Sequence, residues 1–523
     1  MFKKLSALII SLLMTITICS SVNALANETD NTNVDPANKE PNKVLMVNGI
    51  NMVFGGKVLP AASDGSVKGA NYDANKNTLT LNNYNCKSIM AGSLGDNFTI
   101  IANGTNYISG DKQSNGNGIW TYGKLTMAGS GTTNIIATSD FSSYNGAGSA
   151  LKASAFNYVS GTLNITATEY AIDSINAAFG IYINDGEGGG DMVVSGGSIN
   201  VDFQEKKGNS ASFGVLADNI EVSGTGLLKA QSGLALSSGS GAVCCYNAIV
   251  VKDYGRIEAI GGNCASTGVS SISAGIVFFG SLDLYDHGSI YAVGNKASQS
   301  HGIDGRIGIE TSASSSTLNL SLSKAALIHM NYHGGSLIAL TNSSDDANYA
   351  INNTVNIDSQ VANVLWRSDA NSAFTLNNQT EYINNSANAK YNEIRDNVEV
   401  ESSLNHLNLD GDNTALLGKD YRATLKVTDN NYQLPSSIKV SINGKVLTSG
   451  YTYNPSTGLI IISADKLNGT LVIEASGVSK AVVTPTKGNA DSPLTADHSQ
   501  MMLWLTLLLG SATLLTLRKT IKN

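Results

Sequence analysis

The fold is decided by a seven-residue run that recurs along the chain, Gly161-Thr162-Leu163-Asn164-Ile165-Thr166-Ala167. Leu163 and Ile165 alternate with polar residues, and this period of two places apolar side chains on one face of a strand. Variants follow a glycine at three further places, Gly197-Ser198-Ile199-Asn200-Val201, Gly255-Arg256-Ile257-Glu258-Ala259 and Gly288-Ser289-Ile290-Tyr291-Ala292. The run therefore predicts a short strand that is repeated along the chain.

A small residue followed by an aliphatic one marks each repeat a second time. This pair occurs seven times at intervals of 27 to 34 residues, as Gly118-Ile119, Ala150-Leu151, Gly180-Ile181, Gly214-Val215, Ala242-Val243, Gly275-Ile276 and Gly302-Ile303. A further alternating run follows it within the unit, for example Leu125-Thr126-Met127 and Leu282-Asp283-Leu284. Three short strands in about 30 residues, separated by glycine-rich turns, are typical of one coil of a parallel β-helix.

Stacked coils bury an apolar face that a single coil cannot bury. Each strand turns only one or two apolar side chains inward, so a coil gains a core only when neighbouring coils cover it at a spacing of about 4.8 Å. We therefore expect residues 44–397 to form a right-handed parallel β-helix of about nine or ten coils, roughly 45 Å long. The alternative is an array of β-sandwiches, which predicts long hairpins with Asn-Gly turns, and few such turns occur.

The composition favours an all-β chain. Glycine reaches 53 residues, and Asn, Ser and Thr, which form helices poorly, are abundant throughout. A hydrophobic content of 42% is too high for a disordered chain. The formal charge of −8, with no cluster of Lys and Arg in the body, argues against a nucleic-acid partner.

Residues 398–478 have a different pattern, with period-two strands broken by turns, such as Ala423-Thr424-Leu425 and Leu471-Val472-Ile473. We expect a small β-sandwich here that serves as a stalk module. Residues 27–43 are expected to be a disordered linker, and residues 479–491 a flexible linker to the C-terminal segment.

The N-terminus has the three parts of an export signal. Two lysines precede an apolar run from Leu5 to Ile18, and Ala24-Leu25-Ala26 supplies a small-x-small cleavage site. We expect residues 1–26 to be a signal helix that is removed after export. The alternative is an uncleaved N-terminal anchor, for which the apolar run is short.

The C-terminus, residues 492–523, is expected to anchor the chain. The apolar stretch from Met501 to Leu517 is barely long enough for a transmembrane helix, and the basic residues after it would stay in the cytoplasm. The hexapeptide Ser492-Pro493-Leu494-Thr495-Ala496-Asp497 would then lie just outside the membrane.

This order of hexapeptide, apolar stretch and basic tail resembles a sortase cell-wall sorting signal of the Ser-Pro-x-Thr-Gly type found in clostridia, with Ala496 in place of the glycine. The resemblance implies that a sortase-like transpeptidase cleaves after Thr495 and joins its carbonyl to an amine of the peptidoglycan. A single-pass membrane anchor is the alternative. Both arrangements place the body outside the cell, in the cell wall or at the surface of a Gram-positive bacterium.

The body also resembles known surface proteins. Val47-Asn48-Gly49, Ala70-Asn71-Tyr72-Asp73 and residues 77–83 are similar to the first coil of β-helix surface proteins of clostridia and other Firmicutes. Gly161–Ala167 and its copies are similar to carbohydrate-binding β-helix domains of the same organisms. The resemblance covers about residues 44–395 and implies an adhesin-like or carbohydrate-binding surface protein.

Parallel β-helices also include polysaccharide lyases and hydrolases, so paired carboxylates are candidates for catalysis. Glycoside hydrolysis needs two carboxylates within about 5 to 10 Å, and Asp283, Asp286 and Asp304 lie in successive units. His301 and Arg306 faintly echo polygalacturonase elements, but their spacing is too short for that family. We therefore expect solvated turn residues and no enzymatic activity, with a lyase or hydrolase as the alternative.

A calcium loop and a metal site are two further candidates. Residues 184–191 could wrap a Ca²⁺ ion with Asp185, Glu187 and Asp191, although a solvated glycine-rich turn is the commoner explanation. No other metal or cofactor is expected, because the cysteines show no CxxC pair and no histidine at zinc-finger spacing. Cys244 and Cys245 should face opposite sides of a strand, and a disulfide from either to Cys264 stays open.

Binding is the function that the predicted surface favours. Outward Asn, Thr, Ser and Tyr side chains offer repeated donors and acceptors to a glycan or a host surface protein. The expected stacking platforms are Tyr158, Tyr182, Tyr285 and Tyr291, although each could be an ordinary strand residue. The prediction is an exported, anchored, non-enzymatic surface protein, and a passive structural role is the alternative.

Overall fold

The computed structural model describes residues 43–480, apart from residues 95–96, 111–116, 138–147, 168–177, 185–189, 204–206, 209–210, 237–238, 266–271, 286, 298, 306–328, 343–349, 353–354, 359–360, 362–363, 373 and 378–388. Over this part the chain is all-β, and its helical segments are the short 3₁₀ turns η1 (Pro60–Ala62) and η4 (Ala464–Lys466). None of the helices described is long and apolar enough to cross a membrane. The expected signal helix and transmembrane helix lie outside the described residues.

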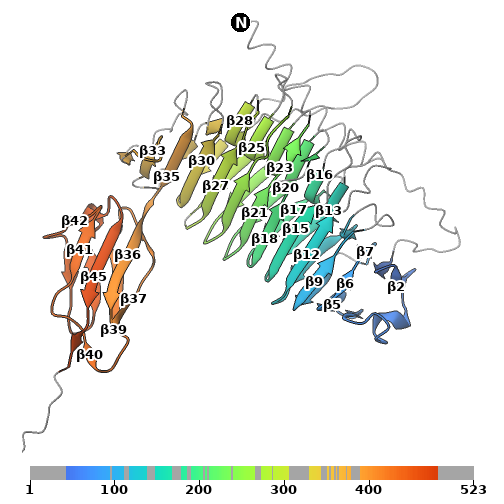
Figure 1. Cartoon of the computed structure of the whole chain (residues 1–523), viewed down its shortest axis with the longest axis horizontal. Coiled ribbons are helices and arrows are strands. Elements are labelled where there is room, and N and C mark those ends of the chain that lie inside the picture. Colours follow the sequence, from blue (N-terminus) through green and yellow to red (C-terminus); the bar gives the residue numbers. More distant parts are fainter. Residues whose placement is uncertain are drawn as a thin grey trace, which may run out of the picture.

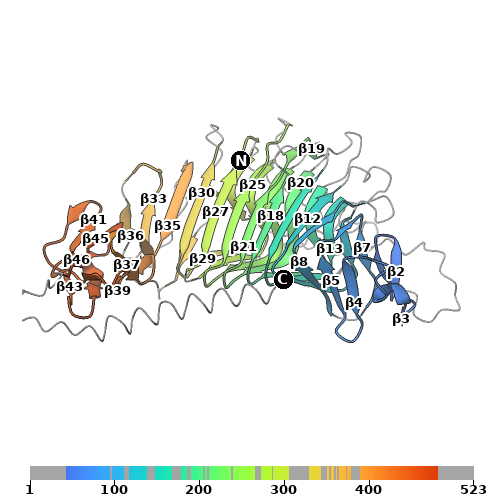
Figure 2. The same cartoon turned by 60° about the horizontal axis from the view of Figure 1, so that its bottom comes forward.

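Most strands belong to three parallel ladders that the chain visits in turn (Figures 1 and 2). The first ladder contains β7 (Ile89–Ala91), β10 (Ile119–Thr121), β13 (Gly148–Ala153), β16 (Ala178–Ile183), β20 (Ala211–Val222), β23 (Gly239–Val251), β25 (Ile272–Phe278), β28 (Gln299–Gly305) and β31 (Ile351–Asn352). The second contains β5 (Thr78–Asn82), β8 (Asn97–Asn103), β11 (Lys124–Ala128), β14 (Ala155–Tyr158), β17 (Asp191–Val194), the second halves of β20 and β23, β26 (Ser281–Leu284), β29 (His329–Tyr332) and β32 (Val355–Ile357). The third contains β6 (Asn85–Cys86), β9 (Thr105–Ile108), β12 (Thr132–Ala137), β15 (Thr162–Ala167), β18 (Ser198–Asp202), β21 (Leu227–Gln231), β24 (Arg256–Ile260), β27 (Ser289–Gly294) and β30 (Ser336–Thr341).

The repeat seen in the sequence is the register of these ladders. The aliphatic residues of the small-aliphatic pairs form one row in the first ladder, Ile119, Leu151, Ile181, Val215, Val243, Ile276 and Ile303. The recurring glycine-led runs align in the third ladder in the same way, from Leu163 to Leu337. Hydrogen bonding between successive repeats therefore follows the sequence period.

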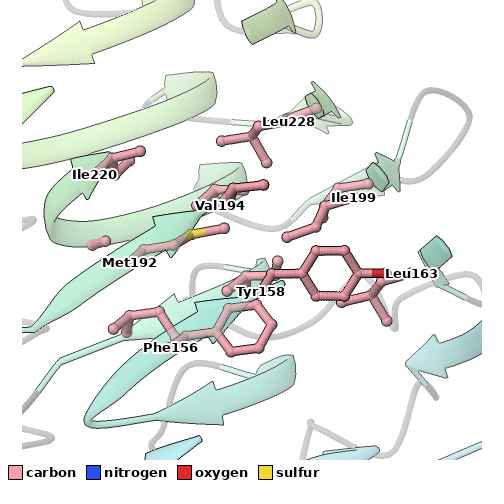
Figure 3. Close-up of a cluster of buried hydrophobic side chains, with 14 of the residues drawn as sticks. Phe156, Tyr158, Leu163, Met192, Val194, Ile199, Ile220 and Leu228 are labelled. Carbon is pink, nitrogen blue, oxygen red and sulfur yellow. The ribbon is translucent and has the colours of Figure 1, made fainter. Parts of the chain in front are cut away.

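One apolar core runs the length of the ladders. Its buried residues extend from Leu45 to Ile394 and come from the inward rows of all three ladders. Figure 3 shows part of it, where Phe156, Met192 and Ile220 of the second ladder lie near Leu163, Ile199 and Leu228 of the third. Because each strand contributes one or two such side chains, the rows of many repeats are needed to exclude water.

The small residue before each aliphatic one is required by close packing. A β-carbon on Gly180 would meet the carbonyl oxygen of Gly214 at 2.5 Å and also the side chain of Val201. A β-carbon on Gly275 would meet the carbonyl oxygens of Ala259 and Gly302 at 2.6 and 2.8 Å. The chain approaches its neighbours too closely at these points for a larger side chain.

A buried row of serines links the first ladder to the segments that follow the third-ladder strands. Ser212, Ser240, Ser273 and Ser300 align in successive strands and are buried. The backbone N–H groups of Gly233, Gly262 and Asn295 donate hydrogen bonds to the hydroxyls of Ser212, Ser240 and Ser273, at 2.8 to 2.9 Å. The row thus satisfies backbone groups that leave the strand ladder in the interior.

Antiparallel strands close both ends of the ladders. At the N-terminal end β1 (Leu45–Val47) pairs with β7 and with β2 (Ile50–Phe54), β2 pairs with β3 (Lys57–Val58), and β4 (Ala70–Asp73) pairs with β5. At the other end β35 (Tyr391–Arg395) pairs with β30 and with β33 (Val364–Arg367), which pairs with β34 (Thr375–Asn377). A small pair, β19 (Lys207–Gly208) and β22 (Leu234–Ala235), lies beside the ladders. These caps cover open strand edges that could otherwise pair with another chain.

The second module begins directly after β35 (Figure 1). A five-stranded sheet contains β36 (Asn397–Asn405), β38 (Thr414–Leu416), β41 (Lys439–Ile442), β42 (Lys445–Val446) and β45 (Leu471–Ser476). A four-stranded sheet contains β37 (Leu407–Asp410), β39 (Tyr421–Val427), β43 (Tyr451–Tyr453) and β44 (Leu459–Ile462), and β40 (Tyr432–Gln433) pairs with β46 (Val478–Ser479). Both larger sheets contribute to one core that includes Leu425, Val440, Ile460 and Ile473.

The serine row predicts that Ser240→Ala destabilises the fold. The hydroxyl of Ser240 donates to the Gly233 carbonyl at 2.8 Å and accepts from the Gly262 N–H, so its loss leaves a buried carbonyl unpaired. We expect the free energy of unfolding, measured with urea, to fall by about 1–3 kcal/mol. Ser198→Ala, at a half-buried outward position, is the control and should change it by less than about 0.5 kcal/mol. Equal effects of the two substitutions would contradict the role of the row.

Candidate functional site

Two of the expected stacking tyrosines are buried, so their assignment as surface platforms is wrong. Tyr158 aligns with Met127 and Val194 in an inward row of the second ladder and is 2% exposed. Its alternation with Phe156 in β14 is the sequence signal that could have placed it in the core. Tyr182 points outward from β16, but it is also buried, in a second apolar cluster with Phe179 and Phe213.

The other two expected platforms are at the surface. Tyr285 is 39% exposed in the turn after β26, and Tyr291 is 36% exposed on the outward face of β27. A third exposed ring, Tyr254, lies in the turn before β24 and was not among the expected platforms. Tyr254 could have been found from its position in the repeat, because residues Lys252–Gly255 form the same turn in their repeat as residues Tyr285–Gly288 form in the next repeat.

These turns stack aromatic rings on one another along the ladders. The rings of Tyr254 and His287 are 4.9 Å apart and 12° from parallel, and those of Tyr285 and His333 are 4.3 Å apart and 6° from parallel. His287 has a φ of 59°, a left-handed conformation that a tight turn imposes. The turns between the second and third ladders therefore form an aromatic corner, defined by Tyr254, Tyr285, His287 and His333.

Carboxylates surround the last histidine of this corner. The Nδ1 atom of His333 is 2.7 Å from Asp358, and its Nε2 atom is 3.7 Å from Asp283. Asp283 also accepts hydrogen bonds from Ser281 and Asn331, both at 2.7 Å. Asp283 is thus held by Ser281 of its own strand and by Asn331 of the neighbouring strand β29. The side chains of Asp286, Asp304 and Arg306 are outside the described residues.

A groove of about 530 Å³ lies beside the corner, where the ladders meet the second module. Strand residues of β24, β27, β30 and β35 line it in two outward rows, Arg256, Ser289, Ser336 and Arg395, and Tyr291, Ile338 and Glu393. The turn residues Tyr254 and His287 line it as well. Residues of the second module, Asn397, Glu399, Asn413 and Thr414, complete it. We call this the junction groove.

Charged side chains in the junction groove are largely paired with one another. Arg256 contacts Glu258 at 2.7 Å, and Lys229 contacts the same carboxylate at 3.4 Å. Glu393 is 5% exposed, accepts a hydrogen bond from Arg367 at 2.7 Å, and accepts another from the hydroxyl of Tyr391 at 2.6 Å. Burial, followed by the bond to Glu393, raises the pKa of Tyr391 to about 12. These pairs hold the groove residues in defined positions.

Arg395 differs from the other cations of the groove. Its guanidinium lies 4.1 Å from the ring centroid of Phe374, and burial lowers its pKa. Its Nε atom is buried and has no hydrogen-bond partner in the part of the chain that the structure describes. Arg395 is thus a cation that lines the groove and is held by an aromatic ring.

The calcium and cysteine expectations have separate outcomes. Asp185 and Glu187 lie outside the described residues, and Asp191 accepts a hydrogen bond from Asn219 at 2.8 Å. Cys244, Cys245 and Cys264 are buried, and none of them forms a disulfide in the described part of the chain. Cys245 lies in the main core and Cys244 in the second apolar cluster, so the two neighbours face opposite sides of the strand as expected. No group of three metal-binding side chains occurs among the residues described. The hexapeptide Ser492–Asp497 lies outside them too.

Comparison of the chain with protein-family models, with curated proteins and with solved structures finds no match.

The buried tyrosines predict a loss of stability at high pH. Burial raises the pKa of Tyr182, Tyr84 and Tyr421 to about 12, whereas an unfolded tyrosine ionises near pH 10. The folded state therefore holds these protons more tightly than the unfolded state does. The contribution of this difference to the free energy of unfolding is fully present below about pH 10 and is lost as the pH rises towards 12.

Titration of the folded protein, followed by ultraviolet absorbance, checks the raised pKa values of the buried tyrosines. We expect an absorbance step near pH 12 that shrinks in Tyr182→Phe. Ionisation of every tyrosine near pH 10 without unfolding would contradict the burial of Tyr182.

Proposed function

We infer that the three ladders are the coils of a right-handed parallel β-helix and that the second module is a β-sandwich. The inference is supported by the chain order of the strands, which visits the three ladders in turn, and by the parallel pairing of each strand with its counterpart one repeat later. The continuous core from Leu45 to Ile394 is what a stack of coils requires.

We propose that the protein is a cell-surface protein that binds carbohydrate in the junction groove. The observation that carries the proposal is the exposed ring of Tyr254, stacked on the half-buried His287, beside hydrogen-bonding side chains in an open groove. A sugar ring has an apolar C–H face that packs on an aromatic ring, and hydroxyls at its edge that need donors and acceptors. Tyr254 offers the first, and Ser289, Ser336 and Arg395 offer the second.

The proposed role is binding without catalysis. Asp283 accepts hydrogen bonds from Ser281 and Asn331, and His333 lies between Asp283 and Asp358. A glycosidase needs two carboxylates that both face the scissile bond across a free space. An imidazole between the two carboxylates favours a structural role for this cluster.

The two ends of the chain support a location outside the cell. The export signal in residues 1–26 and the sorting-type signal in residues 492–523 are proposed to place the ladders in the cell wall of a Gram-positive bacterium. The partners proposed are then a sortase-like transpeptidase, the peptidoglycan, and a glycan of the surroundings or of a host surface protein. Along the chain, the second module lies between the ladders and this proposed anchor.

Removal of the aromatic rings tests the carbohydrate site. Binding would be found on a glycan array and measured by calorimetry with chitohexaose and cellohexaose. We expect Tyr254→Ala and Tyr291→Ala each to weaken binding about tenfold, or roughly 1.4 kcal/mol, because the sugar loses its apolar partner. Tyr107→Ala is the matched control, since Tyr107 is 49% exposed on the same face of the third ladder but does not line the groove. Binding that is unaffected by either groove substitution would refute the site.

Extraction from cells tests the anchor. If Thr495 is joined to the wall, muramidase should release the protein and detergent alone should not. Thr495→Ala should reverse this pattern, because the uncleaved tail would remain in the membrane. Release of the wild-type protein by detergent alone would show a membrane anchor instead of wall linkage.

A further inference from the structure

The second module contributes directly to the junction groove. Asn397 and Glu399 lie on β36, Asn413 precedes β38 and Thr414 begins it, and all four line the groove. The rest of the lining comes from the ladders and their turns. The shape of the groove therefore depends on how the module is held against the ladders, and a freely hinged stalk would not keep it.

A single residue, Asp396, separates β35 of the ladders from β36 of the module. Asp396 is 7% exposed, and its carboxylate accepts hydrogen bonds from the Gly335 N–H at 2.9 Å and from the Asn397 side-chain amide at 3.1 Å. Its backbone N–H donates to the Gly335 carbonyl at 3.3 Å, and its carbonyl accepts from the Leu417 N–H at 2.7 Å. One buried residue thus joins a ladder turn to β36 of the module and to Leu417, the residue that follows β38.

The ladder end of this connection is itself fixed. Gly335 lies in the turn after β29 with a φ of 92°, and a β-carbon there would meet the carbonyl oxygens of Gly288 and Tyr285. The hydroxyl of Tyr332 donates a hydrogen bond to the Gly335 carbonyl at 2.7 Å. Gly288 follows His287, and Tyr285 is itself part of the aromatic corner, so Asp396 is connected to this corner through closely packed backbone.

Side-chain packing reinforces the same junction. Leu365 of β33 is buried in the module core, and Phe374 packs against that core. The guanidinium groups of Arg367 and Arg395 lie 4.5 and 4.1 Å from the ring centroid of Phe374. A cation over an aromatic ring is favourable when both are shielded from water, so these contacts fix Phe374 within the ladder cap. Leu365 and Phe374 then hold the cap against the module, because both pack with the module core.

We propose that the junction groove is a composite binding site and that Asp396 is the residue that positions its two parts. The proposal rests on the carbohydrate-binding function proposed above and assigns the second module a part in recognition. Without Asp396 the second module turns relative to the ladders. The Asn and Glu side chains of the module then no longer contact the sugar that stacks on Tyr254. The specificity of the site then belongs to the pair of modules and not to the rod alone.

Interdomain distance tests the positioning role without any ligand. Spin labels on Lys76→Cys and Lys445→Cys, both at exposed positions, report the distance between the two parts of the full chain. The four cysteines that the structure describes are buried, which favours labelling of the introduced thiols. We expect one narrow distance distribution in the parent chain, a broad one in Asp396→Ala, and little change in Asp396→Asn, which keeps an acceptor oxygen for Gly335.

Calorimetry with chitohexaose and cellohexaose tests the composite site. Asp396→Ala should weaken binding of the oligosaccharide by about tenfold or more, and the far-ultraviolet circular dichroism spectrum should not change. Asp396→Asn should keep most of the wild-type affinity. Asp465→Ala is the control, because Asp465 is exposed in the same module and does not line the groove.

The outcomes separate the two proposals. A narrow distribution in Asp396→Ala overturns the positioning role, whatever the affinity. A broad distribution with unchanged affinity overturns the composite site. If neither oligosaccharide nor any array glycan binds the wild-type chain, the proposed carbohydrate function is wrong, and the distance distribution alone then decides the role of Asp396.

Discussion

The structure depends on one constraint, which is that each repeat must place its inward rows directly over those of the repeat before it. A strand that gives one or two apolar side chains has no core of its own, and it gains one only from in-register neighbours. Ile181 between Leu151 and Val215 shows the arrangement, with parallel pairing on both sides. Insertions are therefore tolerated only in the turns, where no row is broken.

The same constraint explains why the aromatic side chains of the candidate binding site lie in the turns. Turn residues of successive repeats stack as regularly as the strands do, so an aromatic side chain in one turn meets the ring of the next, as Tyr254 meets His287. The strand faces are occupied by their own hydrogen bonds, for example the amide ladder of Asn134, Asn164 and Asn200. A corner with exposed rings is consequently better suited to a ligand than the flat faces.

The end of the ladders adds a second level of organisation. The chain reverses in β35, pairs antiparallel with β30, and enters the second module through one buried residue. Asp396 and the packing of Leu365 and Phe374 with the module core give this junction more contacts than a flexible linker would provide. The groove forms here because two differently built surfaces are held side by side.

Sequence alone determined the all-β class, the repeat interval and the inward residues of most strands, since alternation and spacing are local properties. It also drew attention to Tyr285 and Tyr291, which do lie at the surface. The burial of Tyr158 could have been predicted from its alternation with Phe156 in one strand. The burial of Tyr182 could not, because an outward strand residue is buried only when other segments cover it. The stacking of Tyr254 on His287 follows the repeat interval, because the two residues occupy the same turn of successive repeats. Only the tertiary structure decided how the second module meets the ladders, because contacts such as that of Gly335 with Asp396 join residues that no repeat interval relates.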